Sequence, residues 1–188
     1  DAMNTGATVS MVNSAGENLI QEIVRVSSAQ WDRLMESNLK SAFLMCRAVI
    51  PLMDKKGGSI INVSSTASLL PRTNDPVYGI SKAALNDLSR RLALKYGTDR
   101  IRMNAVCPGA VSNTRIQQTN RKNAKNRKKL EQQLINAMPL GKAFKRMIRP
   151  EEVASLIFFL AGESAKCITG AVIPFDGGKS LGIPPYFR

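Results

Sequence analysis

The sequence predicts an α/β fold in which a parallel sheet carries helices on both faces. Short runs rich in β-branched residues alternate along the chain with amphipathic stretches of helical length, the pattern of strand–helix–strand units. One of these runs, residues 59–65, is mostly apolar without polar alternation, as expected of a strand covered on both faces. The chain has 188 residues, 44% of them hydrophobic and 22% charged, so we expect one folded domain over residues 1–188.

The first predicted elements are a strand, a loop and a long helical region. Residues 7–12 form a short β-rich run, which the loop-forming residues 13–16 then interrupt. Ser27 precedes Gln30 by three residues, the spacing of a helix-capping box, and apolar residues at helical spacing follow it. We expect Pro51, together with the pair of glycines a few residues later, to end this helical region.

The rest of the chain continues the alternation. Helical spacing predicts a helix that ends at Gly97, and Pro108–Gly109 stops the strand that comes next. Pro150 and the two acidic residues after it are typical of a helix N-terminus. In chain order the further predicted elements are strand 59–65, helix 77–96, strand 101–107, helix 123–138, a helix from residue 150 and strand 171–175.

Two residue counts exclude whole classes of active site. The sequence contains no histidine, which excludes Ser-His-Asp and Cys-His relays and histidine-ligated zinc sites. Proton transfer must therefore use Tyr, Lys, Asp, Glu or Cys. The three cysteines, Cys46, Cys107 and Cys167, are widely spaced and odd in number, so we expect neither a disulfide framework nor a metal site. With no long apolar run and no leader-like start, we expect a reducing, cytoplasmic location.

The positive charge is concentrated in one segment. Residues 115–149 hold eleven basic residues and one acid, which accounts for +10 of the net +13. One interpretation is a solvated loop, and a second is a field that attracts an anionic substrate or an acyl-thioester carrier. A third is nucleic-acid binding through residues 121–129, where cations cluster but no aromatic side chain is present for base stacking.

Tyr78 and Lys82 are four residues apart on a predicted helix, so they lie one turn apart on the same face. A nearby cation favours the phenolate and lowers the pKa of a tyrosine, which makes Tyr78 a candidate general acid or base. This spacing alone is common on helix surfaces. The residues around the pair carry the stronger argument.

Landmarks along essentially the whole chain resemble the short-chain dehydrogenase/reductase family. Ser65, at the end of a predicted strand, precedes Tyr78 by thirteen residues, which matches the family spacing. The further landmarks, in family order, are the loop Asn13-Ser14-Ala15-Gly16, Trp31, the pair Asn38-Leu39, the strand end Asn104-Ala105-Val106-Cys107-Pro108-Gly109 and the strand end Phe175-Asp176-Gly177-Gly178.

The resemblance implies a catalytic tetrad and a reaction. Tyr78 would exchange a proton with the oxygen of an alcohol or carbonyl substrate while hydride moves to or from a nicotinamide. Ser65 would hydrogen-bond the same oxygen, and Ser64 is the rival serine with the poorer spacing. Lys82 would lower the pKa of Tyr78 and bind the nicotinamide ribose. Asn38 would hold a water in the proton relay.

The resemblance also implies NAD or NADP as cofactor, a Rossmann-like doubly wound sheet and a homotetramer whose interface holds the helices bearing Asn38 and Tyr78. Pro108, Gly109 and Val111 would face the nicotinamide. The implied cofactor-binding residues are Asn13, Ala15, Gly16, Tyr78, Lys82, Pro108, Gly109 and Val111.

The sequence departs from the family pattern in three places. Ser14 stands where the family has a second asparagine, and Asn113, followed by Thr114, stands where it usually has threonine. The glycine-rich phosphate loop does not follow Thr5-Gly6, and the family's first strands have no counterpart. Because dinucleotide binding depends on that loop, we expect the chain as given to bind cofactor poorly and to expose the edge of a strand. It is either the remnant of a longer enzyme or a truncated, catalytically silent subunit.

Overall fold

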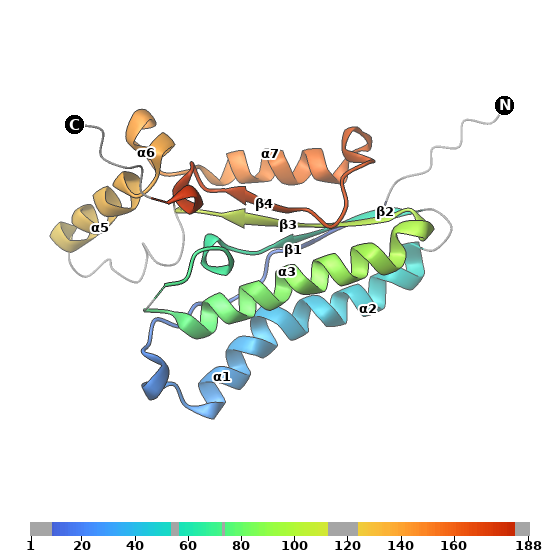
Figure 1. Cartoon of the computed structure of the whole chain (residues 1–188), viewed down its shortest axis with the longest axis horizontal. Helices are drawn as coiled ribbons and strands as arrows, with labels where there is room; N and C mark the ends of the chain where they lie inside the picture. The colour runs from blue at the N-terminus through green and yellow to red at the C-terminus, as the bar shows by residue number, and fades with distance from the viewer. Residues whose placement is uncertain (1–8, 54–56, 73, 113–123, 183–188) are drawn as a thin grey trace.

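The computed structural model describes residues 9–53, 57–72, 74–112 and 124–182, and its centre is one parallel sheet. Four strands lie in the order β1-β2-β3-β4, each parallel to its neighbours (Figure 1). Their bounds are Val9–Asn13 for β1, Gly58–Val63 for β2, Ile101–Pro108 for β3 and Val172–Phe175 for β4. The predicted parallel α/β fold is confirmed, and β1 is an edge strand of the described sheet.

Helices cover both faces of this sheet. The helices α2 (Ser41–Met53) and α3 (Pro76–Tyr96) lie on one face, and α7 (Pro150–Ala161) lies on the other (Figure 1). The crossovers between parallel strands require such helices, because consecutive parallel strands cannot be joined by a tight turn. As a result the carboxyl ends of all four strands meet at one edge of the sheet.

The core explains why strand 58–63 has no polar alternation. Ile60 packs with residues of α2 and α3 on one face, and Ile61 packs with α7 on the other, and both are fully buried. Each face of the strand thus has its own apolar cluster. The buried members of the two clusters are Met11, Cys46, Ile50, Met53, Ile60, Ala93, Ile101 and Met103, and Ile61, Val106, Val153, Leu160 and Ala165.

The predicted capping box is present where the first helical region begins. The Ser27 hydroxyl accepts from the Gln30 amide at 3.2 Å, and the Gln30 side chain accepts from the Ser27 amide at 2.9 Å. The region is not one regular helix, because a π-helical turn, Glu36–Lys40, separates α1 (Ser28–Met35) from α2. The sequence pattern gave no sign of this turn.

The helical region ends between Pro51 and the pair Gly57–Gly58, as expected, but it does not end at Pro51 itself. Pro51 lies inside α2, which continues to Met53. A proline in the last turn removes only one backbone hydrogen bond. Continuing the helix buries Met53 completely against the sheet, and that burial outweighs the loss.

The remaining helices follow the predicted order with one addition. The helix predicted over 123–138 is α5 (Ala124–Asn136), and a second short helix, α6 (Pro139–Phe144), comes directly after it. Ile135, Met138 and Met147 form a small apolar cluster that holds this pair. Short 3-10 helices occupy Ile23–Arg25, Thr66–Ser68, Gly97–Asp99, Glu163–Ala165 and Lys179–Leu181.

Arg102 of β3 fixes the carboxyl end of α7. Its Nη1 donates to the Leu160 carbonyl at 2.7 Å, and its Nη2 donates to the Gly162 carbonyl at 3.2 Å. The Ser59 hydroxyl of β2 donates to the same Leu160 carbonyl at 2.9 Å. Carbonyls that end a helix lack partners within it, so these two strands complete the hydrogen bonding of α7. Among the described helices, none is both long enough and apolar enough to cross a membrane.

Candidate active site

A cavity of about 590 Å³ opens at the edge of the sheet where the strands end. The ends of β2 and β3, the loop after β1 and the first turns of α3 form its floor, while α5 and α7 contribute apolar side chains. Ligands of open α/β sheets bind at this edge, because helix N-termini and loops converge there. The cavity is therefore the place to test the predicted site residues.

Most of the predicted site residues line this one cavity. The structure brings Gly16, Ser65, Tyr78, Lys82, Pro108, Gly109 and Val111 together there. Asn38 lies directly behind the cavity wall, where it contacts wall residues. Asn13 and Ala15 do not line the cavity. The positions of Asn113 and Thr114 lie outside the described residues.

The pKa of Tyr78 is raised, contrary to the expectation from the sequence. Burial is the largest cause, and a hydrogen bond with Ser65 and the positive charge of Arg72 oppose it in part. The cation that acts on the phenol is thus Arg72, whose Cζ lies 5.9 Å from the centroid of the Tyr78 ring, and not Lys82. The spacing of two residues on a helix gives no information about burial, and burial decides this pKa.

Lys82 is buried beneath the same cavity. Its side chain is 4% exposed, and burial lowers its pKa to about 8. The ammonium donates to the Val63 carbonyl at 3.0 Å. The loop after β1 passes close above it, since a Cβ added at Gly16 would stand 3.2 Å from Lys82 Nζ and 2.9 Å from Asn38 Oδ1. Only glycine fits this close approach without a shift of its neighbours.

The two candidate serines have different surroundings. The Ser65 hydroxyl accepts from the Ala67 amide at 3.2 Å and hydrogen-bonds Tyr78. The Ser64 hydroxyl instead donates to the Lys82 carbonyl at 3.1 Å, and its residue is 5% exposed. Ser65 is therefore the serine that stands beside the phenol, and Ser64 ties the end of β2 to α3.

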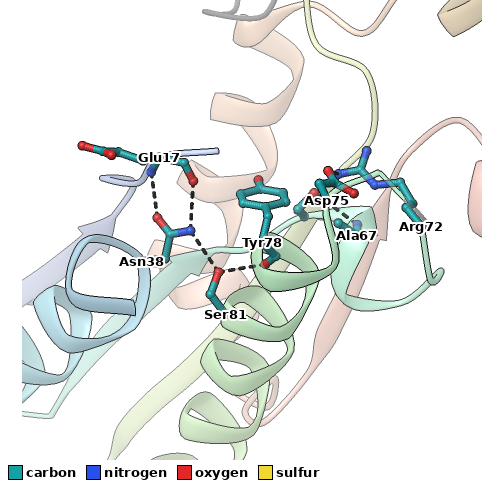
Figure 2. Close-up of polar contacts among 8 residues, drawn as sticks. Glu17, Asn38, Ala67, Arg72, Asp75, Tyr78 and Ser81 are labelled. Atoms are coloured by element: carbon teal, nitrogen blue, oxygen red, sulfur yellow. Dashed lines mark hydrogen bonds and ion pairs between the residues drawn. The ribbon is translucent and has the colours of Figure 1, made fainter. Parts of the chain in front are cut away.

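Asn38 connects three segments around Tyr78, as Figure 2 shows. Its Oδ1 accepts from the Glu17 amide at 2.7 Å, and its Nδ2 donates to the Glu17 carbonyl at 2.9 Å. The same Nδ2 donates to the Ser81 hydroxyl at 2.9 Å, which donates to the Tyr78 carbonyl at 2.8 Å. The side chain of Asn38 thus positions the cavity wall and the helix that bears Tyr78.

The Asn13 side chain forms hydrogen bonds in the protein interior and does not line the cavity. Its Nδ2 donates to Asn62 Oδ1 at 2.7 Å, and Asn62 Nδ2 donates to the Ser89 hydroxyl at 2.8 Å. A weaker contact of 3.9 Å reaches the Cys46 sulfur, whose pKa burial raises to about 11. This chain of amides links β1, β2 and α3 at the point where the site begins.

Sequence reasoning missed two cations of the cavity, Arg72 and Lys179. Arg72 precedes α3 and forms an ion pair with the buried carboxylate of Asp75. Lys179 follows β4, far away in sequence from Tyr78. A basic residue three positions before an acid was a local signal for the Arg72–Asp75 pair, but no sequence pattern connects Lys179 to this place.

The basic segment is only partly described. Leu130 and Leu134 of α5 line the cavity, so the apolar side of this helix faces the site. Arg146 makes two hydrogen bonds of 2.9 and 2.7 Å to Glu152, whose pKa is lowered to about 2 chiefly by this contact. The cluster 121–129 begins outside the described residues, so nucleic-acid binding through it stays a prediction. No group of three or more cysteines and carboxylates suited to a metal ion occurs in the part of the chain that the structure describes.

Known proteins resemble this chain over most of its length. A family model described as enoyl-(acyl carrier protein) reductase matches residues 4–180. A tropinone reductase homolog of Arabidopsis thaliana and a D-beta-hydroxybutyrate dehydrogenase of Rhizobium meliloti are each 36% identical to it, over 172 and 170 residues. The alignments cover 91% and 89% of this chain but 62% and 66% of the two relatives. The chain thus spans just under two thirds of the length of these proteins.

Solved structures share the fold. The aldohexose dehydrogenase of Thermoplasma acidophilum, in ligand-free form, superposes with a TM-score of 0.87 at 29% identity, over 96% of this chain and 71% of that one. An angucycline C-6 ketoreductase with bound NADP superposes with a TM-score of 0.80 at 32% identity, over 95% and 66%. With a family model that matches nearly the whole chain and relatives of the same architecture, this chain belongs to the short-chain dehydrogenase/reductase family.

Proposed function

We propose that the protein interconverts a secondary alcohol and a ketone by NAD(P)-dependent hydride transfer, with Tyr78 as the general acid and base. The observation that carries the proposal is the meeting of Ser65, Tyr78 and Lys82 at one cavity at the carboxyl edge of the sheet. The dehydrogenases and reductases among the similar proteins support the same class of reaction.

The residues of the cavity fit a nicotinamide cofactor. Two glycines let the loops that line the cavity pack tightly against neighbouring residues: a Cβ at Gly16 would meet Lys82 and Asn38, and one at Gly109 would stand 2.9 Å from the Asp176 Cα. The Lys82 ammonium makes one described hydrogen bond, to Val63, and a lysine has three donors. Its remaining donors are available for ribose hydroxyls. The cofactor, when bound, supplies or accepts the hydride.

Side chains of the protein carry out the proton transfer. Because burial raises the pKa of Tyr78, the phenol is protonated at neutral pH and is ready to donate to a carbonyl oxygen. Ser65, which hydrogen-bonds the phenol, is placed to hydrogen-bond the same oxygen as charge develops on it. Asn38 acts as a positioning residue through Ser81 and Glu17.

Steady-state kinetics of variants tests this proposal. Tyr78→Phe keeps the ring but removes the proton, so kcat/KM for ketone reduction with NAD(P)H should fall by about a hundredfold or more. Ser65→Ala and Ser64→Ala are a matched pair at neighbouring positions. The first should lower kcat, while the second should lower only the stability. Full activity of Tyr78→Phe would contradict the proposal.

We further propose that the protein is a homo-oligomer, a tetramer, whose subunits meet through the helices that bear Asn38 and Tyr78. A groove lies between the Glu36–Lys40 turn, α2 and α3, and Phe43 on its rim is 45% exposed. Apolar surface at such a groove favours burial against a second copy. Phe43→Glu should lower the mass measured by light scattering, and the exposed Phe158 of α7, as Phe158→Glu, is the control. An unchanged mass for Phe43→Glu would contradict this interface.

A further inference from the structure

Two cationic side chains line the cavity beside Tyr78 and take no part in the proposed proton transfer. Arg72 comes four residues before α3, and Lys179 follows β4. The Arg72 Cζ lies 5.9 Å from the centroid of the Tyr78 ring, and Figure 2 shows this side chain on the side of the ring away from Asn38. Burial first, and then the charge of Arg72, lower the pKa of Lys179, while the charges of Asp176 and Asp75 oppose this shift.

Both cations keep hydrogen-bonding capacity that the described chain does not use. Arg72 donates from Nη2 to Oδ2 of Asp75, but its Nε is buried without a partner, and so is Oδ1 of Asp75. Buried polar atoms without partners are rare in folded proteins and call for an explanation. The Lys179 ammonium makes no hydrogen bond or ion pair with any residue that the structure describes.

The acids near these two cations are Glu17, Asp176 and Asp75, and only Asp75 forms an ion pair with one of the cations among the described residues. Glu17 is the one acidic residue among the described cavity-lining residues, and its carboxylate is bonded to Arg33 at 3.0 and 3.1 Å. Asp176 lies close to Lys179 in sequence, but its carboxylate accepts from the amides of Gly178 and Ser180 at 2.9 and 2.7 Å. Asp75 forms its one ion pair with Arg72. The described lining of the cavity thus has three basic side chains, Arg72, Lys82 and Lys179, and one acidic side chain, Glu17, although the charges of Asp176 and Asp75 also act on Lys179.

We propose that Arg72 and Lys179 form an anion-binding subsite, so that the physiological substrate is a hydroxy acid or keto acid. The inference rests on the proposed function, because it places the reacting oxygen at Ser65 and Tyr78 and the carboxylate at the two cations. A guanidinium matches the planar geometry of a carboxylate, and an ammonium adds a strong point charge. In a partly buried cavity such charge-assisted hydrogen bonds are stronger than in water.

A matched pair of substrates tests the subsite: a short keto acid and its methyl ester, which keeps the ketone but removes the charge. The protein should prefer the acid. Lys179→Gln should lower kcat/KM for the acid by about ten- to a hundredfold, the loss expected for one charged hydrogen bond, and change that for the ester less than threefold. Arg72→Gln would leave Asp75 buried and unpaired, so the double variant Arg72→Gln/Asp75→Asn is used for the second cation.

Two exposed cations away from the cavity provide charge-matched controls, Arg25→Gln and Lys166→Gln. Neither should change the ratio of kcat/KM for acid and ester. Calorimetric binding of the corresponding hydroxy acid gives a readout that does not need turnover, and Lys179→Gln should weaken that binding by the same factor.

The possible failures are distinguishable. Equal kcat/KM for acid and ester in the unaltered protein, or an unchanged ratio in Lys179→Gln, would overturn the subsite while leaving the proposed reaction intact. The subsite would also be overturned if Arg25→Gln and Lys166→Gln lost the preference for the acid in the same way as Lys179→Gln. The preference would then come from the overall charge of the protein. If the proposed reaction is wrong, the Tyr78→Phe variant will still turn over both the ester and the acid.

Discussion

The side chain of Asn38 holds both backbone groups of Glu17, with its Oδ1 accepting from the amide at 2.7 Å and its Nδ2 donating to the carbonyl at 2.9 Å. Glu17 lines the cavity, and Asn38 lies within the π-helical turn Glu36–Lys40 that offsets α1 from α2. Asn38 is 1% exposed, and its amide also reaches Ser81 in α3. One buried amide therefore sets the positions of the wall and of the tyrosine helix together.

Asn38→Ala should lower the free energy of unfolding by about 3 kcal/mol, because three hydrogen bonds are lost and the Glu17 backbone groups lose their partner. Urea denaturation measures this loss. Ser37→Ala, one residue earlier, is the control and should change the stability by less than about 0.5 kcal/mol. Equal effects of the two variants would contradict the role given to the Asn38 side chain.

Gly16→Ala should destabilise the protein by about 1–3 kcal/mol, because the new methyl would stand 2.9 Å from the fixed Asn38 Oδ1. Gly97→Ala is the opposite case. Gly97 has a φ of −61° and nothing within 4 Å of an added Cβ, so alanine there should be neutral or stabilise by up to about 1 kcal/mol. Thermal unfolding of the two variants should give shifts of opposite sign, and a destabilised Gly97→Ala with an unaffected Gly16→Ala would refute this assignment.

The spacing of apolar residues along the sequence predicts the strands and most of the helices. A strand buried on both faces gives a continuous apolar run, and a helix buried on one face gives apolar residues at helical spacing. The Ser27 capping box and the helix start at Pro150 are local signals of the same kind, and both are present in the structure. The π-helical turn at Glu36–Lys40 is different, because it depends on how Asn38 meets Glu17 and Ser81 across the fold. Tertiary contacts of this type leave no periodicity to read.

The candidate site, too, has features that the sequence predicts and features that depend on tertiary contacts. The resemblance to a family located Ser65, Tyr78 and Lys82, and all three line the cavity. The sign of the Tyr78 pKa shift could not be predicted, since it depends on burial and not on spacing. Nor could the presence of Lys179 at the same cavity as Tyr78, since Lys179 follows β4 and is far from Tyr78 in sequence.

Lys82 should make the stability depend on pH. Its pKa is about 8 in the fold against an ordinary value of 10.5, so between these values the unfolded chain binds more protons than the folded one. The contribution of Lys82 to stability is thus complete above pH 10.5 and lost as the pH falls through 8. Relative to Lys82→Met, the free energy of unfolding should rise by about 1.5 kcal/mol between pH 8 and 9.5.

The measurement is urea denaturation of both proteins across this pH range, with the exposed Lys166→Met as control. The difference between the unaltered protein and the control should stay flat. If the difference in free energy of unfolding between the unaltered protein and Lys82→Met also stays constant with pH, the Lys82 ammonium is not desolvated by the fold.

Arg102→Met should loosen the carboxyl end of α7. The guanidinium donates to carbonyls of Leu160 and Gly162, and a cation at this end also interacts favourably with the helix dipole. We expect a loss of about 2–3 kcal/mol in the free energy of unfolding and faster amide hydrogen exchange in the last turn of α7. Arg90→Met, at an exposed position on α3, should change neither quantity. Because α7 also forms part of the cavity wall, unchanged exchange in Arg102→Met would show that the apolar contacts of Val153 and Leu160 hold the helix without the arginine.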